Sequence, residues 1–228
     1  MSVLFVIPTP VGNLDDITIR AVETLKHVGV VLAEDTRKTG ILLGHLGISV
    51  KMMSHHMFNE HQTLQSVVDL ILSGTRVGLV SDAGTPAISD PGFLLVRECI
   101  RNNIRVETLP GPSAFVPALV NSGLPCDRFC FEGFLPVKKG RKTRLEKLKN
   151  ETRTMVFYES PHKLLKTIRD LSVVFGSARQ ASVSRELTKI HEENIRGSLE
   201  ELSAYYAENT LKGEITLVVE GCNEKKTD

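Results

Sequence analysis

Short apolar runs alternate with helical repeats along the first half of the chain. Five runs have the length and the β-branched content of buried strands: residues 3–7, 28–33, 49–53, 76–80 and 105–109. Apolar residues recur at helical spacing in 17–27, where Asp15 or Asp16 is expected to be the cap, and a second helix is predicted at 60–73. This alternation predicts a mostly parallel sheet covered by helices, in which ligands bind beyond the carboxyl ends of the strands.

The pattern changes in a stretch rich in Pro and Gly, residues 109–125, which also contains a predicted helix at 113–121. Further strands are expected at 129–134, 154–159, 180–185 and 213–220. Helices are expected at 161–174 and 198–207, and a basic helix ends near residue 150. We therefore predict an α/β protein with two domains, 1–112 and 113–228.

The composition is that of an ordinary soluble protein. The 228 residues suffice for two cores, with 41% apolar and 24% charged residues. The N-terminus lacks the basic lead and the cleavage site of a signal peptide, and no apolar run reaches the length of a membrane span. The four cysteines show neither metal-ligand spacing nor a secreted disulfide framework: Cys99, Cys126, Cys130 and Cys222. We expect a soluble cytoplasmic protein without membrane association.

The net charge of +1 hides a local excess of positive charge. Residues 138–153 contain eight Lys or Arg and two Glu, so this segment carries +6 and the rest of the chain −5. Such a segment is a candidate anion-binding surface. Leu145 and Leu148 give the same helix an apolar stripe, so a solvated helix face is the alternative. If the anion is RNA, the densest run of cations would contact its phosphates: Lys138, Lys139, Arg141, Lys142 and Arg144.

Several common catalytic motifs do not occur in the sequence. The chain has no G-x-G-x-x-G, no G-x-x-x-x-G-K-[ST], no G-x-S-x-G and no H-E-x-x-H. His55, His56 and His61 cluster around Glu60, but no second ligand pair stands at a fixed spacing. We therefore predict a solvated loop at these histidines and no metal site.

Four loops that directly follow predicted strands are rich in Gly, Pro, Ser and Thr: residues 8–13, 81–92, 110–114 and 158–161. Small residues let backbone N–H and C=O groups approach a ligand closely. Any one of these loops alone is an ordinary connection between a strand and a helix, in which Gly and Pro are common. Four such loops together favour a bound cofactor. In the second loop, Asp90 is expected to cap the next helix and Pro91 to begin it.

Eight segments, in order and spread over nearly the whole chain, resemble one protein family. They are PTPVGNLDDIT, AEDTRKTG, LVSDAGTPAISDPG, LPGPSA, DRFCFEGFLP, FYESPHKL, SRELTK and GEITLVVEG. Each is weakly specific, but together they are similar to the ribosomal RNA small subunit methyltransferase I family. That family belongs to the tetrapyrrole-methylase-like, class III S-adenosylmethionine-dependent methyltransferases.

The resemblance implies a fold and an activity. It implies two α/β domains of the tetrapyrrole-methylase type, the first with a mostly parallel and the second with a mixed sheet. The cofactor S-adenosyl-L-methionine would lie in the cleft between them, and the protein would be a homodimer. The implied reaction is 2'-O-methylation of a cytidine in the decoding centre of 16S ribosomal RNA.

The resemblance also implies which residues bind the cofactor. They are Val11, Gly12, Asp82, Ala83, Gly84, Thr85, Ile88, Ser113, Ala114, Glu159 and Leu187, with Glu214 as a neighbour. Two positions depart from the superfamily pattern. Relatives carry Gly-Pro-Gly in the first loop, where this chain has Pro-Val-Gly-Asn. Thr85 stands where many tetrapyrrole methylases have Asp, which suits a different substrate.

The catalytic residues are harder to assign from the sequence. A ribose 2'-hydroxyl is weakly acidic, so a base or a cation near its oxygen would help. The candidates are Asp35 and Arg37, and Glu186 and Lys189. An acidic helix N-terminus at 34–37 and an internal ion pair between residues 185 and 186 are the alternatives.

Two other functions remain open at this point. One is a small-molecule methylase that acts on a tetrapyrrole, which the basic segment and Thr85 disfavour. The other is a non-catalytic RNA-binding module, against which Gly84, Ser113 and Ala114 argue.

Overall fold

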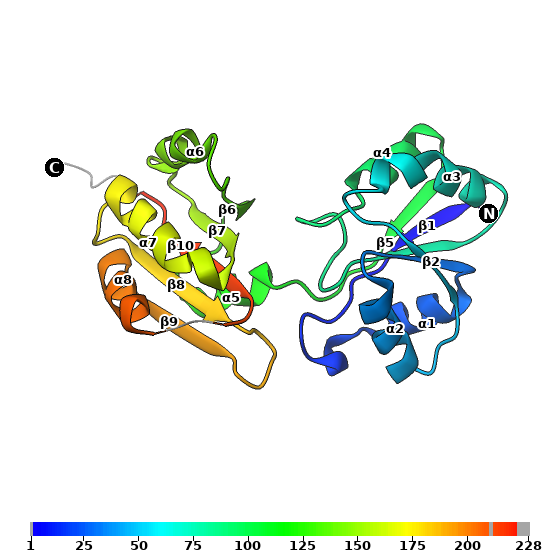
Figure 1. The fold of residues 1–228 in the computed structure, drawn as a ribbon, viewed down its shortest axis with the longest axis horizontal. Coiled ribbons are helices and arrows are strands. Elements are labelled where there is room, and N and C mark those ends of the chain that lie inside the picture. Colours follow the sequence, from blue (N-terminus) through cyan, green and yellow to red (C-terminus); the bar gives the residue numbers. More distant parts are fainter. Residues whose placement is uncertain (1, 210–211, 223–228) are drawn as a thin grey trace. The chain divides into compact units, whose positions relative to one another are not determined.

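The structure, a computed structural model, describes residues 2–209 and 212–222. The chain forms two compact units, Met1–Ser113 and Ala114–Asp228. Each unit contains its own sheet, and Figure 1 draws both as ribbons. The division falls one residue after the expected end of the first domain.

The first unit is built on a parallel sheet of five strands in the order β3-β2-β4-β1-β5. All residues of β2 and β4 are buried, as expected for central strands covered on both faces. Figure 1 shows α3 and α4 on one face of this sheet and α1 and α2 on the other, each pair with its own apolar cluster. The strands are β1 Val3–Val6, β2 Val30–Ala33, β3 Lys51–Ser54, β4 Val77–Val80 and β5 Arg105–Thr108. The helices are α1 Ile19–His27, α2 Thr36–His45, α3 Glu60–Leu72 and α4 Phe93–Arg101, with a 3-10 turn at Leu14–Asp16.

Two predicted helix starts are wrong in detail. The cap of α1 is Thr18, whose hydroxyl accepts a hydrogen bond of 3.0 Å from the N–H of Ala21; Asp15 and Asp16 lie in the preceding 3-10 turn. The residue before α4 is Gly92, at φ 128°, instead of Asp90. In both cases a residue that often caps helices is present, but the chain makes a further turn after it before the helix begins.

The second unit has a mixed sheet, which together with the first sheet confirms the expected fold class. Its strand order is β6-β7-β10-β8-β9; β6 and β7 are parallel, and the other neighbours are antiparallel. Helices α6, α7 and α8 cover one face and α5 the other. The strands are β6 Phe129–Phe134, β7 Thr154–Glu159, β8 Gln180–Arg185, β9 Glu193–Ser198 and β10 Ile215–Val219. The helices are α5 Phe115–Ser122, α6 Arg141–Leu148, α7 Pro161–Phe175 and α8 Leu199–Glu208.

Strand β9 was not predicted from the sequence. Its residues are polar and only half-buried for the most part, because it is an edge strand that pairs on one side with β8. Within the described residues, no helix combines the length and the apolarity that a bilayer crossing requires.

Candidate functional site

Three of the four predicted loops meet in the first unit, at the carboxyl ends of β1, β4 and β5. Thr9 and Gly84 exchange two backbone hydrogen bonds of 2.9 Å each. The hydroxyl of Thr9 donates to the carbonyl of Ser81 at 3.1 Å, and the hydroxyl of Thr85 donates to the carbonyl of Pro112 at 3.1 Å. The loops that start at residues 8, 81 and 110 therefore form one connected group of peptide segments.

The middle loop adopts conformations that most residues avoid. Gly84 has φ 80° and Gly92 has φ 128°, and two residues with side chains, Ala87 and Ser89, also have positive φ, at 70° and 62°. Each such non-glycine conformation costs about 1–3 kcal/mol and persists where the surroundings enforce it, often at functional sites. A Cβ on Gly92 would approach Leu79 Cδ2 to 2.7 Å, so this position has no room for a side chain.

Small and partly accessible residues occupy these loops. Gly84 is buried, whereas Gly12 is exposed and Ile88 is 40% exposed. The other predicted cofactor residues of this unit are half-buried: Val11, Asp82, Ala83, Thr85 and Ser113. Ala114, the first residue of the second unit, directly precedes α5 and is half-buried as well.

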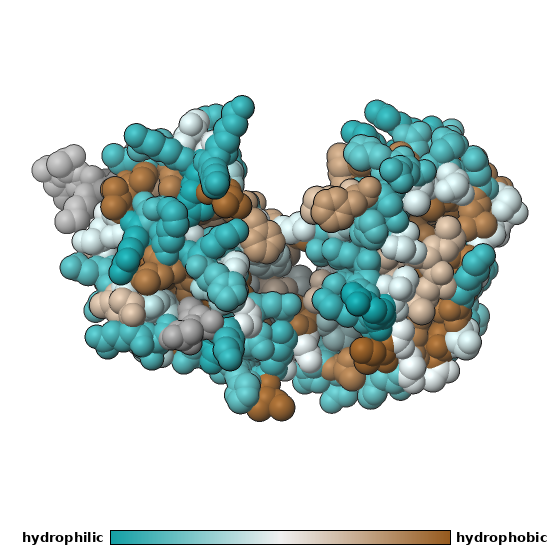
Figure 2. All heavy atoms as spheres, in the orientation of Figure 1, coloured by the Kyte–Doolittle hydropathy of each residue, from teal (hydrophilic) through white to brown (hydrophobic). Residues whose placement is uncertain are grey.

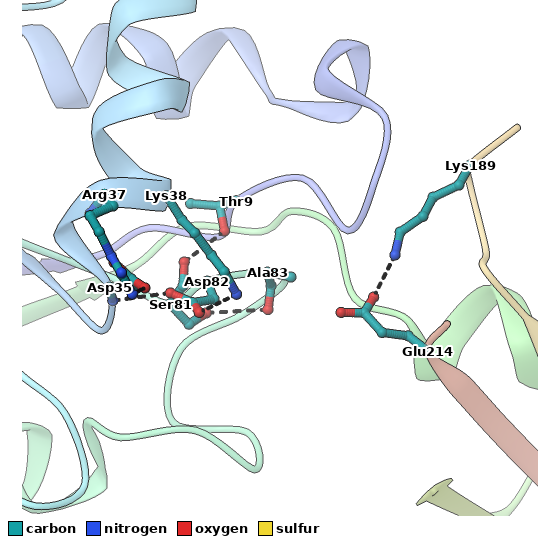
Figure 3. A network of polar contacts seen from close by, with 9 residues as sticks. All are labelled: Thr9, Asp35, Arg37, Lys38, Ser81, Asp82, Ala83, Lys189 and Glu214. Atoms are coloured by element: carbon teal, nitrogen blue, oxygen red, sulfur yellow. Dashed lines mark hydrogen bonds and ion pairs between the residues drawn. The ribbon is translucent and has the colours of Figure 1, made fainter. Parts of the chain in front are cut away.

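Asp82 has a structural role that the sequence did not reveal. Its Oδ1 accepts a hydrogen bond of 3.0 Å from the backbone N–H of Asp35, and its Oδ2 lies 2.7 Å from Lys38 Nζ, as Figure 3 shows. The Asp82 carboxylate thus links the loop after β4 to the first turn of α2. Its side chain is engaged within the first unit, so a cofactor contact at this position would involve the backbone.

Asp35 caps α2. Its Oδ1 accepts from the backbone N–H of Arg37 at 2.9 Å and from Arg37 Nε at 3.0 Å, and its Oδ2 accepts from Arg37 Nη2 at 2.7 Å. These hydrogen bonds lower the pKa of Asp35 well below its usual value and raise the pKa of Arg37. Asp35 is therefore a poor proton acceptor, while Arg37 offers a permanent positive charge.

Two acidic residues near these loops were not singled out from the sequence as titrating groups. Burial, with the nearby carboxylates of Glu34 and Asp82, raises the pKa of Asp90 to about 7. Burial and the carboxylate of Asp82 also raise the pKa of Glu34. From the local pattern, Asp90 was expected only to cap a helix, because its burial and the approach of other carboxylates depend on the tertiary fold.

In the second unit, Glu186, Lys189 and Glu214 form a small polar network. Glu186 Oε1 accepts from the N–H of Glu214 and from Lys189 Nζ, both at 2.9 Å, and Lys189 Nζ also lies 3.0 Å from Glu214 Oε2. Figure 3 draws the contact between Lys189 and Glu214. The hydrogen bond from Lys189 lowers the pKa of Glu186. Burial alone would lower the pKa of Lys189, but the hydrogen bonds to Glu186 and Glu214 outweigh it and raise that pKa.

The loop that carries this network is held in an unusual backbone conformation. Glu186 and Thr188 have φ 50° and 68°. Leu187, between them, is 7% exposed and packs with Leu119 and Val218. The Leu187 side chain therefore belongs to the core, and this position could offer a cofactor mainly its backbone.

Glu159 is also committed to the fold. Its side chain is buried, Oε1 accepts from the N–H of Ser160 at 2.7 Å, and Oε2 accepts from the hydroxyl of Thr167 at 2.5 Å. These bonds tie the end of β7 to α7. The carboxylate of Glu159 therefore has an internal role, and the cofactor contact at this position stays a prediction that would involve the backbone.

The basic segment divides into two groups. Lys138, Lys139 and Lys142 are exposed. Arg141 is 9% exposed, and its guanidinium donates to Asp170 and to the Thr167 hydroxyl at 2.8 Å each and to the carbonyl of Pro136 at 3.3 Å. These internal partners disfavour the expected RNA contact of Arg141, because its guanidinium is engaged within the second unit.

Arg144 is exposed at the surface, but it pairs with Glu132 on β6. This ion pair ties α6 to the edge strand of the second sheet. Of the predicted RNA-contacting cations, the three lysines are the best placed to meet a phosphate.

The expected solvated loop at the histidines is only partly solvated. His55 is 1% exposed, and its Nδ1 lies 3.2 Å from the hydroxyl of Thr63; burial lowers the pKa of His55. Across the part of the chain that the structure describes, no three or more His, Cys, Asp or Glu side chains are arranged to hold a metal ion.

Comparison with known proteins agrees with this architecture. The family described as Tetrapyrrole (Corrin/Porphyrin) Methylases matches residues 3–203. A solved uroporphyrin-III-C-methyltransferase from Thermus thermophilus superimposes with a TM-score of 0.68 over 96% of this chain and 94% of that chain. Its sequence identity of 19% makes this a likeness of fold alone. The chain belongs to the tetrapyrrole methylase family.

Within that family, several similar curated proteins carry the name Ribosomal RNA small subunit methyltransferase I. The relative from Synechocystis sp. is 49% identical over 97% of this chain and 80% of its own length. The relative from Thermotoga maritima is 45% identical over 97% of this chain and 99% of its own length. These relatives confirm the resemblance that the eight sequence segments indicated.

Proposed function

We propose that this protein transfers a methyl group from S-adenosyl-L-methionine to the ribose 2'-oxygen of a cytidine in the decoding centre of 16S ribosomal RNA. The observation that carries the proposal is the joining of three small-residue loops at one edge of the first sheet. The relatives at 44–49% identity are named as methyltransferases of small-subunit ribosomal RNA, which supports the choice of substrate.

The loops of the first unit suit this cofactor. Methyltransferases of the tetrapyrrole methylase type use S-adenosylmethionine, whose sulfonium supplies an already activated methyl group. A glycine at φ 80° and neighbours with short side chains leave peptide groups accessible to adenosine and to the methionine part. The residues that would hold the cofactor there are Val11, Gly12, Ala83, Gly84, Thr85, Ile88 and Ser113, and the second unit would add Ala114 and the backbone at 159 and 187.

The residues that assist the reaction follow from their charges. The reaction needs the methyl carbon and the ribose oxygen in line, and alignment alone supplies on the order of 7–11 kcal/mol for well-oriented reactants. Arg37 and Lys189 are the cations that could stabilise the oxygen as it loses its proton. The lowered pKa values of Asp35 and Glu186 make both carboxylates weak acceptors for that proton, so their role is to position Arg37 and Lys189.

The substrate and the assembly complete the proposal. Lys138, Lys139 and Lys142 would contact RNA phosphates, in a substrate that is the small ribosomal subunit or its RNA. We further propose that the protein is a cytoplasmic homodimer.

The experiment is methyl transfer from labelled S-adenosylmethionine to small ribosomal subunits from a strain that lacks this gene. Mass-spectrometric mapping should find one new ribose methyl group, on a cytidine of the decoding centre. A porphyrinoid acceptor in a parallel reaction tests the alternative small-molecule activity. Label on the porphyrinoid alone, or failure to bind S-adenosylhomocysteine in calorimetry, would refute the proposal.

A further inference from the structure

Five aromatic side chains form a continuous row on one face of the second sheet. Phe129, Phe131 and Phe134 lie on β6, Tyr158 lies on β7, and Phe115 is the first residue of α5. The ring centroid of Phe115 lies 6.1 Å from the ring centroid of Phe129 and 5.0 Å from that of Phe131. The ring centroid of Tyr158 lies 5.1 Å from that of Phe131 and 5.7 Å from that of Phe134. We call these five residues the aromatic row.

A β-bulge brings Phe134 into this row. Phe131 is the register partner of Val156, but the register then shifts, and Phe134 is the partner of Tyr158. The extra residue is Glu132. In a regular strand, residues 131 and 134 would point to opposite faces, because successive side chains alternate.

The row lies on the less covered part of its face. Helix α5 packs on the same face against β7, β8, β9 and β10, over buried residues such as Val156 and Val218. Towards β6 the rings themselves form the surface: Phe134 is 59% exposed and Phe129 is 37% exposed. In Figure 2, apolar residues reach the surface beside β6. A contiguous exposed group of aromatic rings is typical of a binding surface.

Positive charge begins immediately after the row. From Phe134 the chain runs through Val137, which is 60% exposed, to the exposed Lys138 and Lys139. The four Cα–Cα steps from Phe134 to Lys138 span at most about 14 Å. Lys142 follows in the first turn of α6, and the ion pair between Arg144 and Glu132 holds this helix next to the bulge.

We propose that the aromatic row stacks unpaired bases of the substrate RNA while Lys138, Lys139 and Lys142 hold the adjoining phosphates. Stacking platforms beside cations are the usual means of binding single-stranded nucleic acid. The identity of the RNA rests on the proposed function, but the binding mode does not.

The test uses the full-length protein and a single-stranded oligouridylate that contains 5-iodouridine. Phe134→Ala and Phe129→Ala should each weaken binding about tenfold, since stacking on one ring is worth that much or more. Phe134→Trp should keep the affinity, whereas Phe134→Leu, apolar but not aromatic, should lose it. Tyr205→Ala is the matched control, because Tyr205 is a 37% exposed aromatic residue on α8, which covers the other face. Photo-cross-links from the 5-iodouridine of the oligonucleotide should form with residues of the aromatic row.

Several results would overturn the proposal. Unchanged affinity in both alanine variants, full affinity in Phe134→Leu, or cross-links only outside the row would each do so. If Phe134→Ala or Phe129→Ala halves the mass that light scattering measures for the wild type and leaves the RNA affinity unchanged, the aromatic row is a contact between subunits. Methyl transfer by the wild-type protein is measured in a separate experiment. Failure of methyl transfer would refute the proposed function, whereas the oligonucleotide experiment alone tests whether the aromatic row binds RNA.

Discussion

Glu60 accepts a hydrogen bond of 3.0 Å from the backbone N–H of Gly92, and this bond is buried. Glu60 is the first residue of α3, and Gly92 ends the loop whose φ values are strained. Nε2 of the buried His55 lies 3.8 Å from the same carboxylate oxygen. The end of the candidate cofactor loop is therefore fixed from a different helix, 32 residues earlier in the chain.

We expect Glu60→Ala to destabilise the protein by about 1–3 kcal/mol, because the N–H of Gly92 would be left buried without an acceptor. Glu60→Gln keeps an acceptor oxygen and should recover most of this loss. Urea unfolding measures both. Equal destabilisation by the two variants would show that charge, and not the hydrogen bond, is what matters.

Gly84→Ala should weaken the binding of S-adenosylhomocysteine about tenfold or more. An added Cβ would meet Pro112 O at an ordinary 3.7 Å, so the cost comes from φ 80°, where a residue with a side chain pays about 1–2 kcal/mol. Gly74→Ala is the matched control, since Gly74 has φ 98° with open space around it and lies in the turn after α3. Both variants should lose stability. Calorimetry should show a weaker affinity for S-adenosylhomocysteine in Gly84→Ala and an unchanged affinity in Gly74→Ala.

Asp90 should make stability depend on pH. Its pKa rises from 3.8 to about 7 on folding, so between these values the unfolded chain loses a proton that the folded chain keeps. Stability of the wild type therefore falls as pH rises from about 4 to about 7 and is then level. Asp90→Asn removes this loss, so the variant should match the wild type at pH about 4 and be more stable than the wild type at pH about 8, by an amount that solvent screening of the partly exposed carboxylate limits.

The measurement for Asp90 is the difference in free energy of unfolding between variant and wild type across that pH range. The exposed Asp16→Asn controls for the general loss of a carboxylate. A difference for Asp90→Asn that shrinks as pH rises would contradict the assignment.

The three exposed lysines should set the salt dependence of RNA binding. Replacing Lys138, Lys139 and Lys142 by Gln should reduce the slope of log affinity against log salt by about 2, at roughly 0.7 for each phosphate contact with a single strand. Lys163→Gln, on the exposed side of α7, should leave the slope unchanged. Filter binding at several salt concentrations gives both slopes, and an unaltered slope in the triple variant would exclude these contacts.

Arg141 should behave differently from these lysines. Arg141→Ala removes the donors to Asp170, Thr167 and Pro136 and should cost about 2 kcal/mol of stability, because hydrogen bonds to charged groups are among the stronger ones. Arg141→Lys should recover only part of this stability, since the lysine ammonium lacks the planar arrangement of N–H donors of a guanidinium. Thermal unfolding tests this, and an undiminished melting temperature in Arg141→Ala would return Arg141 to the RNA-binding candidates.

The sequence predicted the architecture well and the side-chain environments poorly. Strand–helix alternation was sufficient for the parallel sheet, because buried parallel strands read as continuous apolar runs. The loops after β1, β4 and β5 were chosen correctly as neighbours, since the ends of parallel strands meet at one edge. Strand β9 was missed because its polar residues carry no alternation, and its pairing with β8 comes from the tertiary fold.

The polar residues explain why the rest could not be predicted. Asp82 and Glu159 were candidates through the family resemblance and Arg141 through the density of cations around it, yet each bonds to a residue at least eight positions away in the chain. Asp90 reads as a helix cap, but its pKa depends on burial and on carboxylates from other segments. Long-range pairing of this kind leaves no local pattern in a single sequence.

The extra residue in β6 can be removed without turning the rings to the other face. Gly133 and Phe134 already pair with Phe157 and Tyr158, so deleting Glu132 alone would leave Phe131 and Phe134 two positions apart in a regular strand, on the same face. Deleting Gly133 as well would make the two phenylalanines neighbours and turn the ring of Phe134 to the opposite face. We therefore expect a β6 shortened by Glu132 alone to keep base stacking while it loses the ion pair with Arg144, and a β6 shortened by both residues to lose base stacking.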